Sequence, residues 1–400
     1  MQELNNNGAY AHGLDGQLAE PDWPQLTGNE IRGVLRNYPA LGQPGKVLMV
    51  SPRPFSAASV VATETQDVFI KRHHVSVRNE DGLREEHRFM QHLRAHGAAV
   101  PRVFIAESGE SAIKVGEWVY EVHESPRGLD VYREAISWTP FLSAGHARSA
   151  GQTLARLHQA SSGYSAPPRR GRQLIAGFTI YASPDPATEL DRYVAARPAL
   201  GAYLAERSCR EEALHLLEPF HLELLPLLPY LAPLWTHNDL HASNLLWSDE
   251  STDAHAVAVI DFGLADRTNA VHDLAHAIER SIVDWLALVN HPERPEDVAI
   301  HYEHLFALLD GYESVRPLAR EESMALAPMM ALCHAEFALS ETDYFLGVLH
   351  SEEKAWYACE GYLVAHARWF RGPGSRLLDA LRDRAAKRER AVCGMGTGQE

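Results

Sequence analysis

A segment in the second half of the chain places a carboxylate and a side-chain amide at a spacing suited to phosphate chemistry. In THNDLHASNLLW, Asp239 stands two residues after His237 and five residues before Asn244. An apolar stretch follows, and AVAVIDFG then supplies Asp261. Phosphoryl transfer needs a carboxylate near the acceptor hydroxyl and oxygen ligands that hold Mg²⁺ against the phosphates. The two segments together predict a magnesium–ATP site.

A loop followed by a β-hairpin would bring these side chains together. Strands are expected at 245–247 and 256–262, joined by the polar loop SDESTDAH. Asn244 then lies at the start of one strand and Asp261 at the end of its partner, so both oxygens converge on the metal. Asp239, on the preceding loop, would accept or orient the hydroxyl proton during attack.

Farther upstream, the pattern predicts a cation for the phosphates and a carboxylate to hold it. DVFIK ends the third expected strand with Lys71. Alone, Lys71 would be an ordinary edge-strand lysine, but together with the downstream motifs it is favoured as the phosphate clamp. Glu86 lies within the apolar face of a helix expected at 81–95, whereas Glu85 points away. Because a buried glutamate needs a cationic partner, we expect Glu86 to pair with Lys71.

The order of elements predicts an α+β, bilobal fold: a small, mostly antiparallel β lobe with one key helix, and a larger, mainly helical lobe. Three strands, a helix and two further strands, PRVFIAES and GEWVYEVH, account for residues 46–123. The expected organisation is a flexible N-terminal arm (1–30), a nucleotide-binding lobe (31–123), an interlobe link (124–128), a catalytic and substrate-binding lobe (129–386) and a frayed tail (387–400).

Composition excludes several classes of function. The net charge of −16, from 37 basic and 53 acidic residues, argues against a nucleic-acid partner or an anionic membrane surface. The four cysteines form no C-x-x-C pair, so a disulfide framework or a structural zinc site is not expected. The most apolar stretch, 216–235, contains charged residues and prolines, so no membrane span is predicted and a cytoplasmic location is expected.

The chain contains 22 histidines, of which His73 and His74 are the most obvious candidates for a metal site. Adjacent residues on a strand point to opposite faces, so these two side chains cannot easily share one ion. We therefore expect a surface pair.

These motifs resemble the aminoglycoside phosphotransferase family, which includes choline-kinase-like and homoserine-kinase-like relatives within the protein-kinase-like fold. The similarity rests on HNDLHASNLL, VIDFG, Lys71, REEHRFMQHLRAHG with VPRV, and AGQTLARLH, and it covers roughly residues 45–390. It implies that Asp239 is the catalytic base, that Asn244 and Asp261 are metal ligands, and that Lys71 binds phosphate.

The chain departs from the kinase signature in the nucleotide loop and after the base. PFSAAS (54–59) replaces a glycine-rich loop, so Ser56 and main-chain amides would cover the phosphates. His241 stands where protein kinases carry a lysine; it either approaches the γ-phosphate or is a structural loop residue. Adenine is expected against the main chain of the link, at Val122, His123 and Glu124.

The remaining alternatives for the function differ in the molecule that accepts the phosphate. Only nine residues separate Gly263 from Asp273, which leaves no room for a peptide-binding activation segment and favours a small hydroxyl compound such as an aminoglycoside, choline or homoserine. An atypical serine/threonine protein kinase is the second hypothesis, and a pseudokinase binding module is the third. Three acidic residues could meet an amine-bearing acceptor or simply form a solvated helix face: Asp191, Glu212 and Glu336.

Overall fold

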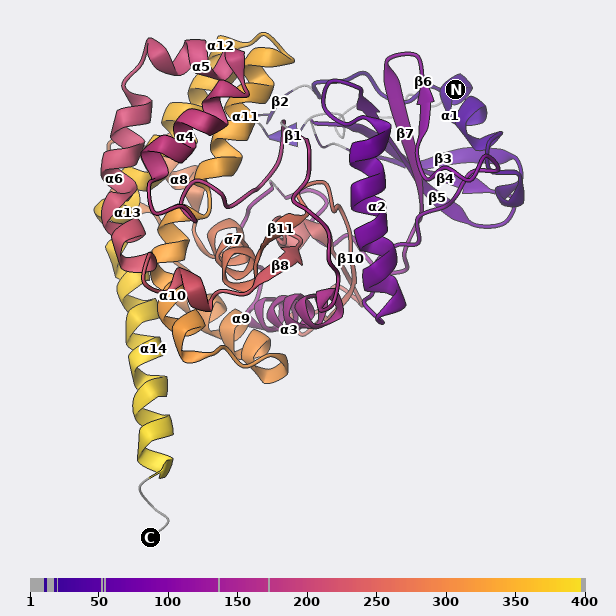
Figure 1. Cartoon of the computed structure of the whole chain (residues 1–400). Helices are drawn as coiled ribbons and strands as arrows, with labels where there is room; N and C mark the ends of the chain where they lie inside the picture. The colour runs from indigo at the N-terminus through magenta and orange to yellow at the C-terminus, as the bar shows by residue number, and fades with distance from the viewer. Residues whose placement is uncertain are drawn as a thin grey trace.

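The computed structural model describes residues 21–396, apart from 52, 54, 136 and 172, together with residues 11–12 and 18–19. It contains the two expected lobes, one built on a β-sheet and one mainly helical (Figure 1). The sheet is antiparallel, in the order β3-β4-β5-β7-β6. Its strands are β3 (Pro44–Val50), β4 (Ala57–Thr63), β5 (Asp67–His74), β6 (Ile113–Val115) and β7 (Trp118–Glu124). The α+β prediction is confirmed.

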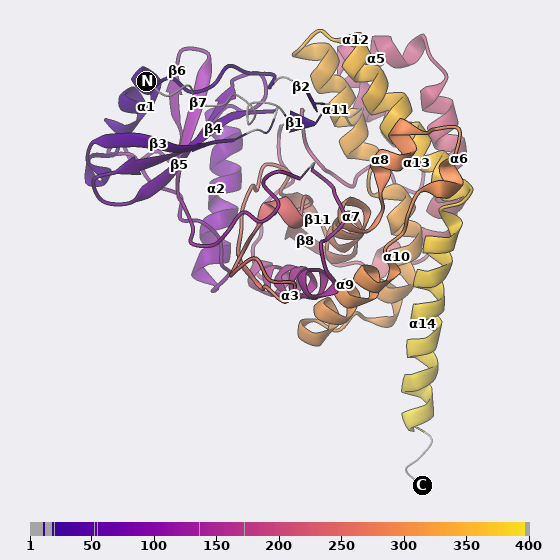
Figure 2. The ribbon, with the colours of Figure 1, turned by 180° about the vertical axis from the view of Figure 1, so that it is seen from behind.

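Helix α2 (Glu80–Ala95) lies between the two lobes. Asn79 caps its first turn by accepting a hydrogen bond from the Gly82 amide, and Gly97 ends it in the left-handed conformation at φ 84°. One face of the helix belongs to the large core of the helical lobe, where Phe89 packs against Trp235 and Phe262. In Figures 1 and 2 the helix lies between the sheet and the helical lobe. Residues of α2 can therefore contact both sides of the interlobe region.

The second lobe is formed by helices around two short antiparallel strand pairs. The long helix α14 extends from this lobe in both views (Figures 1 and 2). The helices of this lobe are α3 (Ala144–Ser161), α4 (Pro186–Ala195), α5 (Pro198–Ala205), α6 (Cys209–Leu224), α7 (Ala270–Ile282), α8 (Trp285–Asn290), α9 (Tyr302–Val315), α10 (Arg320–Leu332), α11 (Ala335–Gly347), α12 (Glu352–Trp356), α13 (Ala365–Arg371) and α14 (Ser375–Gly396), with a π-helix at Tyr357–Val364 between α12 and α13. None of the helices within the described ranges is long and apolar enough to cross a membrane.

The two strand pairs position the motif residues. Strand β8 (Pro233–Thr236) pairs with β11 (Asp266–Asn269), and β9 (Leu245–Trp247) pairs with β10 (Ala256–Val259), both antiparallel. The segment 237–244 connects β8 to β9, and the segment 260–265 connects β10 to β11. Both connections therefore run between the β8–β11 pair and the β9–β10 hairpin. The sequence predicts the hairpin but not the β8–β11 pair.

The link between the lobes passes close to the β9–β10 hairpin. Leu129 and Trp247 exchange two main-chain hydrogen bonds, of 2.8 and 2.9 Å. Gly128 adopts φ 134°, and a β-carbon there would lie 2.6 Å from Val257 Cγ2. Glycine is required at this position because any side chain would collide with the hairpin.

One predicted strand is wrong. Residues 101–108 make only an isolated bridge, Val103 to His123, and the outer strand is instead β6. The turn between β6 and β7 is made by Gly116 at φ 62°, which lets Ile113–Val115 fold back onto β7. The apolar run at 101–108 instead turns away at Ala106, whose amide bonds the carbonyl of Glu110.

The predicted arm and tail also need correction where they are described. Helix α1 (Gly28–Leu35) begins within the expected arm, with a capping box formed by Thr27 and Glu30. Asp22 accepts a hydrogen bond of 2.6 Å from Lys354 and one of 3.0 Å from Tyr344. At the other end, α14 stays helical to Gly396, beyond the start expected for a frayed tail.

Candidate active site

The loop that carries Asp239 is anchored by the first turn of α7. Asp273 accepts hydrogen bonds from the main-chain amides of His237 (2.9 Å) and Asn238 (2.8 Å). Asn238 adopts φ 59°, a conformation that asparagine tolerates better than most residues. His237 packs against the ring of Phe262 and lies 3.1 Å from the carbonyl of Ile260, so it supports the loop. The loop is therefore anchored through the two residues that precede Asp239.

Both oxygens of Asp239 have protein partners. Asn244 Nδ2 donates to Asp239 Oδ2 at 3.1 Å and to its main-chain carbonyl at 2.9 Å. Arg280 Nη1, from α7, forms an ion pair with Asp239 Oδ1 and also donates to the Asn238 carbonyl at 2.9 Å. Burial raises the pKa of Asp239, and the Arg280 charge opposes that shift. These contacts therefore fix the orientation of the Asp239 carboxylate.

Asp261 and Lys71 form the second half of the site. Lys71 Nζ lies 3.0 Å from Asp261 Oδ1, and the Gly263 amide donates to the same oxygen at 3.2 Å. Burial opposes the charge of Asp261, but Lys71 outweighs it and lowers the carboxyl pKa to about 2. Asp261 adopts φ 57°, a strained conformation for a non-glycine residue, and such conformations cluster at functional sites.

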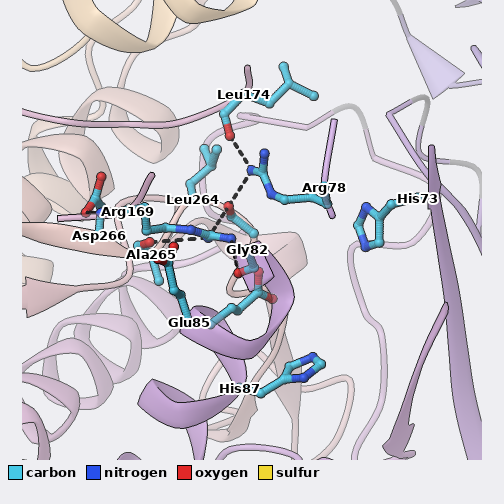
Figure 3. Close-up of polar contacts among 12 residues, drawn as sticks. His73, Arg78, Gly82, Glu85, His87, Arg169, Leu174, Leu264, Ala265 and Asp266 are labelled. Atoms are coloured by element: carbon cyan, nitrogen blue, oxygen red, sulfur yellow. Dashed lines mark hydrogen bonds and ion pairs between the residues drawn. The ribbon is translucent and has the colours of Figure 1, made fainter. Parts of the chain in front are cut away.

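The predicted ion pair between Lys71 and Glu86 is wrong. Glu86 is buried as expected, but its carboxylate lies 3.3 Å from Arg169 Nη2. Arg169 also donates to the carbonyls of Gly82 and Gly263, at 3.0 and 2.9 Å, in the contact network of Figure 3. A guanidinium has five donors in a planar fork, so it can bind Glu86 and main-chain carbonyls together, whereas Lys71 is held by Asp261.

A single cavity of about 400 Å³ collects most of the predicted residues. It is lined by Ser56, Lys71, Asp239, His241, Asn244 and Asp261. Ser56 lies in the loop before β4; Pro54, the first residue of the predicted phosphate-covering segment, is outside the described residues, and 57–59 belong to β4 itself. The structure therefore brings together the predicted base, metal ligands and phosphate-binding lysine.

His241 is buried beside the base. Its Nε2 lies 3.8 Å from Asp239 Oδ1. Burial, with the nearby charges of Arg53 and Arg280, holds the pKa of His241 well below its usual range. The imidazole is consequently neutral at physiological pH and acts there as a hydrogen-bonding group rather than as a cation.

The residues predicted to bind adenine do not line this cavity. Val122, His123 and Glu124 end strand β7, and the side chains of Val122 and His123 are buried. The carbonyl of Val122 accepts from the Phe104 amide at 2.9 Å, and the Glu124 amide donates to the Arg102 carbonyl at 2.8 Å. Because neighbouring main chain already binds these groups, the expected adenine contacts at Val122 and Glu124 are not available.

The cavity is also lined by aromatic side chains. They include Trp138, Trp285, Phe337, Tyr357 and Tyr362. The buried Glu341 of α11 joins them, and burial raises the pKa of its carboxyl to about 8. A pocket of this kind, apolar with a few polar groups, is suited to a small ligand.

The three acidic residues considered for an amine-bearing acceptor lie elsewhere. Asp191 pairs with Arg210 at 2.5 Å, and Glu212 pairs with Arg368 at 2.6 Å. Glu336 is buried and accepts a hydrogen bond of 2.6 Å from the main-chain amide of Ile180. None of the three lines the cavity.

Two oxygens in the site fit a magnesium ion. The amide nitrogen of Asn244 is directed at Asp239, which leaves its oxygen as the donor atom on the cavity side. Asp261 uses Oδ1 for Lys71, so its other oxygen remains for a cation. One carboxylate and one amide oxygen are the hard donors that Mg²⁺ prefers.

Sequence reasoning missed the arginines of this site. Arg280 and Asp273 are seven residues apart on α7, so they lie on the same helix face and both reach the loop around Asp239. The available sequence signal for Arg280 was its position on the buried face of a helix, the same face as the aspartate near the start of that helix. Arg169 lies in an irregular segment, where no periodic pattern indicated its position.

Comparisons with known proteins support the same fold and family. The fold is similar to a microcompartment-associated aminopropanol kinase (TM-score 0.57, 18% identity, covering 85% of this chain and 95% of that one). It also resembles an amicoumacin kinase in complex with AMP-PNP, Ca²⁺ and Ami (TM-score 0.53, 14% identity, 86% and 96%). An aminoglycoside phosphotransferase from Alicyclobacillus acidocaldarius gives a TM-score of 0.50 at 15% identity, over 91% and 98%.

No protein with a curated description matches the chain. The family model described as the phosphotransferase enzyme family matches residues 54–318, which include all four residues of the Asp239, Asn244, Asp261 and Lys71 set. With that match and the geometry above, the chain belongs to the phosphotransferase enzyme family.

Proposed function

We propose that this enzyme transfers the γ-phosphate of ATP to a hydroxyl group of a small molecule and requires Mg²⁺. The observation that carries the proposal is the convergence of Lys71, Asp239, Asn244 and Asp261 on one cavity. In phosphoryl transfer the protein mainly positions the reactants and neutralises charge, and these four side chains supply those functions.

Each residue has a distinct role in this proposal. Asp239 orients the acceptor hydroxyl and takes its proton as the oxygen attacks phosphorus. The oxygens of Asn244 and Asp261 hold Mg²⁺, which when bound neutralises phosphate charge. Lys71 binds phosphate oxygens, and Asp261 keeps its ammonium group at the cavity. Ser56 and the neutral His241 are placed to donate hydrogen bonds to phosphate oxygens.

The acceptor is proposed to be a small aminoalcohol or aminoglycoside. Only Leu264–Asn269 separates Gly263 from α7, and part of this segment pairs as β11 with β8. Such a short segment offers no platform for a peptide, which disfavours a protein acceptor. The aromatic residues and Glu341 that line the cavity suit an organic molecule with apolar and polar groups. Related kinases of this fold act on aminopropanol and on amicoumacin.

A panel assay tests this proposal. ADP release would be followed with MgATP and aminoglycosides, choline, amino-acid alcohols, simple sugars or a generic protein substrate. We expect stimulation by at least one small hydroxyl compound, with the phosphorylated product visible by mass spectrometry, and no stimulation in Asp239→Ala. Phosphorylation of the protein substrate alone would overturn the small-molecule proposal.

A further inference from the structure

Three histidines surround a buried glutamate on the inner face of the β-sheet. Glu121 of β7 pairs in register with Lys71 of β5, and its side chain is only 1% exposed. His87 Nε2, from α2, lies 2.7 Å from Glu121 Oε2, and His123 Nε2 lies 3.0 Å from the same oxygen. His73 Nε2 lies 2.9 Å from the other oxygen, Oε1. His73 is therefore buried, contrary to the surface pair expected from the sequence.

The Glu121 carboxylate has no arginine or lysine within ion-pair distance among the described residues. Lys71, which is paired with Glu121 in the sheet, is bonded to Asp261 instead. A buried carboxylate needs compensating positive charge. The groups in contact with Glu121 that can supply this charge are the three histidines, or an ion bound to them.

The positions of the donor atoms fit a transition-metal ion. His87 Nε2, His123 Nε2 and one Glu121 oxygen all lie within 4.8 Å of one another. The two histidine nitrogens are 3.5 Å apart, close to the roughly 3.3 Å that separates two ligands on a tetrahedral ion with bonds of about 2.0 Å. Two imidazole nitrogens at this distance can share a proton or a metal, but they cannot both donate to each other.

Hydrogen-bond partners outside the set His87, Glu121 and His123 fix the orientation of these side chains, as in known metal sites. His87 Nδ1 lies 2.9 Å from the hydroxyl of Ser111, which fixes the ring and directs Nε2 toward Glu121. His73 holds the second carboxylate oxygen of Glu121. In metalloproteins such outer hydrogen bonds set the tautomer of a histidine ligand and the orientation of a carboxylate ligand. Figure 3 shows His73 and His87 on β5 and α2, beside the contacts of Arg78 and Arg169.

We propose that His87, Glu121 and His123 bind one Zn²⁺-like ion, with His73 as the outer partner of the carboxylate. Two imidazoles and one carboxylate suit Zn²⁺, which often binds three protein ligands and a water molecule. Mg²⁺ prefers oxygen donors and is not expected here. The ion would join β7 to α2 next to Lys71, separately from the cation expected at Asn244 and Asp261. It stabilises the small lobe whether or not the proposed reaction is correct.

The test uses the full chain, purified without a histidine tag and stripped of metal. We expect one Zn²⁺ per chain by calorimetric titration, a visible absorption spectrum of tetrahedral Co²⁺, and a Tm raised by several degrees with Zn²⁺. His87→Asn and Glu121→Gln should each weaken Zn²⁺ binding by roughly tenfold or more. A metal-stripped wild type that binds neither ion stoichiometrically would overturn the proposal, whatever the variants do.

Two matched controls separate this site from other binding. His96→Asn disrupts the partly exposed His92–His96 pair, one turn apart on the same helix, which is the natural place for adventitious metal. Asp261→Asn removes a ligand of the expected magnesium site. Both controls should keep stoichiometric Zn²⁺. Loss of Zn²⁺ in either control, with retention in His87→Asn, would place the ion elsewhere and contradict the proposal.

Discussion

Arg280 on helix α7 forms an ion pair with Asp239, the proposed catalytic base. Arg280 is fully buried, and the nitrogen that contacts Asp239 also donates to the Asn238 carbonyl at 2.9 Å. Asp273, at the start of the same helix, holds the amides of His237 and Asn238. Helix α7 therefore fixes both the main chain of the loop and the orientation of its carboxylate.

This relationship predicts strong coupling between Arg280 and Asp239. Arg280→Met would leave a partly buried carboxylate without its charged partner, which typically lowers the free energy of unfolding by about 3–5 kcal/mol. Asp239→Asn should also be destabilising, and the double variant should lose less than the sum of the two by about 1 kcal/mol or more. Urea unfolding of the four proteins measures this difference.

The exposed pair Arg192 and Glu189 on α4 is a suitable comparison for that cycle. It is separated by one helical turn and has a contact distance of 2.7 Å. An exposed pair of this kind contributes about 0.5 kcal/mol or less. If the coupling free energy between Arg280 and Asp239 were as small as that of the Arg192–Glu189 pair, the ion pair would have no role in holding the loop.

Asp261→Asn should reduce the effect of magnesium on nucleotide binding. The substitution removes the carboxylate charge that is directed at the proposed cation and also the ionic partner of Lys71. Calorimetric titration of ATP with and without Mg²⁺ would show a smaller difference in affinity for the variant than for the wild type. Glu250→Gln, an exposed change in the β9–β10 loop, serves as the control. An unchanged magnesium dependence in Asp261→Asn would count against its role as a ligand.

Glu341 predicts a pH dependence of stability. Its carboxyl pKa is about 8 in the folded chain and near 4.5 when unfolded, so the folded state binds more protons between these values. Stability then falls as pH rises from about 5 to 8, by up to about 1.4 kcal/mol per pH unit. Glu341→Gln is neutral throughout, so its advantage over the wild type should grow across this range. The measurement is urea unfolding at several pH values.

The exposed Glu353, which also lines the cavity, provides the matched control for this experiment. Glu353→Gln should leave the pH dependence of the wild type unchanged. A wild type and a Glu341→Gln variant with parallel pH profiles would mean that Glu341 does not retain its proton in the folded chain.

The sequence predicted the parts of the site that depend on local order along the chain. Asp239, Asn244 and Asp261 lie on connections between short strands, so their spacing is enough to bring them together. Lys71 lies within β5, a strand with a recognisable apolar pattern, and it lines the same cavity. The sheet and helix α2 followed from periodicity, although one outer strand was placed about ten residues too early.

Contacts between distant segments could not be predicted in the same way. Glu86 was correctly assigned to a buried helix face, but its partner Arg169 comes from an irregular segment 83 residues away. The Val122 carbonyl and the Glu124 amide, which were expected to meet adenine, are bonded to residues 102–104, and no local pattern reveals such a bridge. The histidines around Glu121 come from two strands and a helix, so only the folded chain brings them together.

The most direct test of the proposed chemistry is the turnover of Asp239→Ala with an acceptor found in the panel assay. ADP release at saturating acceptor and ATP affinity by calorimetry would be measured for this variant and the wild type. We predict a turnover lower by roughly 100-fold or more with ATP affinity nearly unchanged, because Asp239 acts on the acceptor proton and not on the nucleotide. Wild-type turnover in Asp239→Ala would contradict its assignment as the base and with it the central claim.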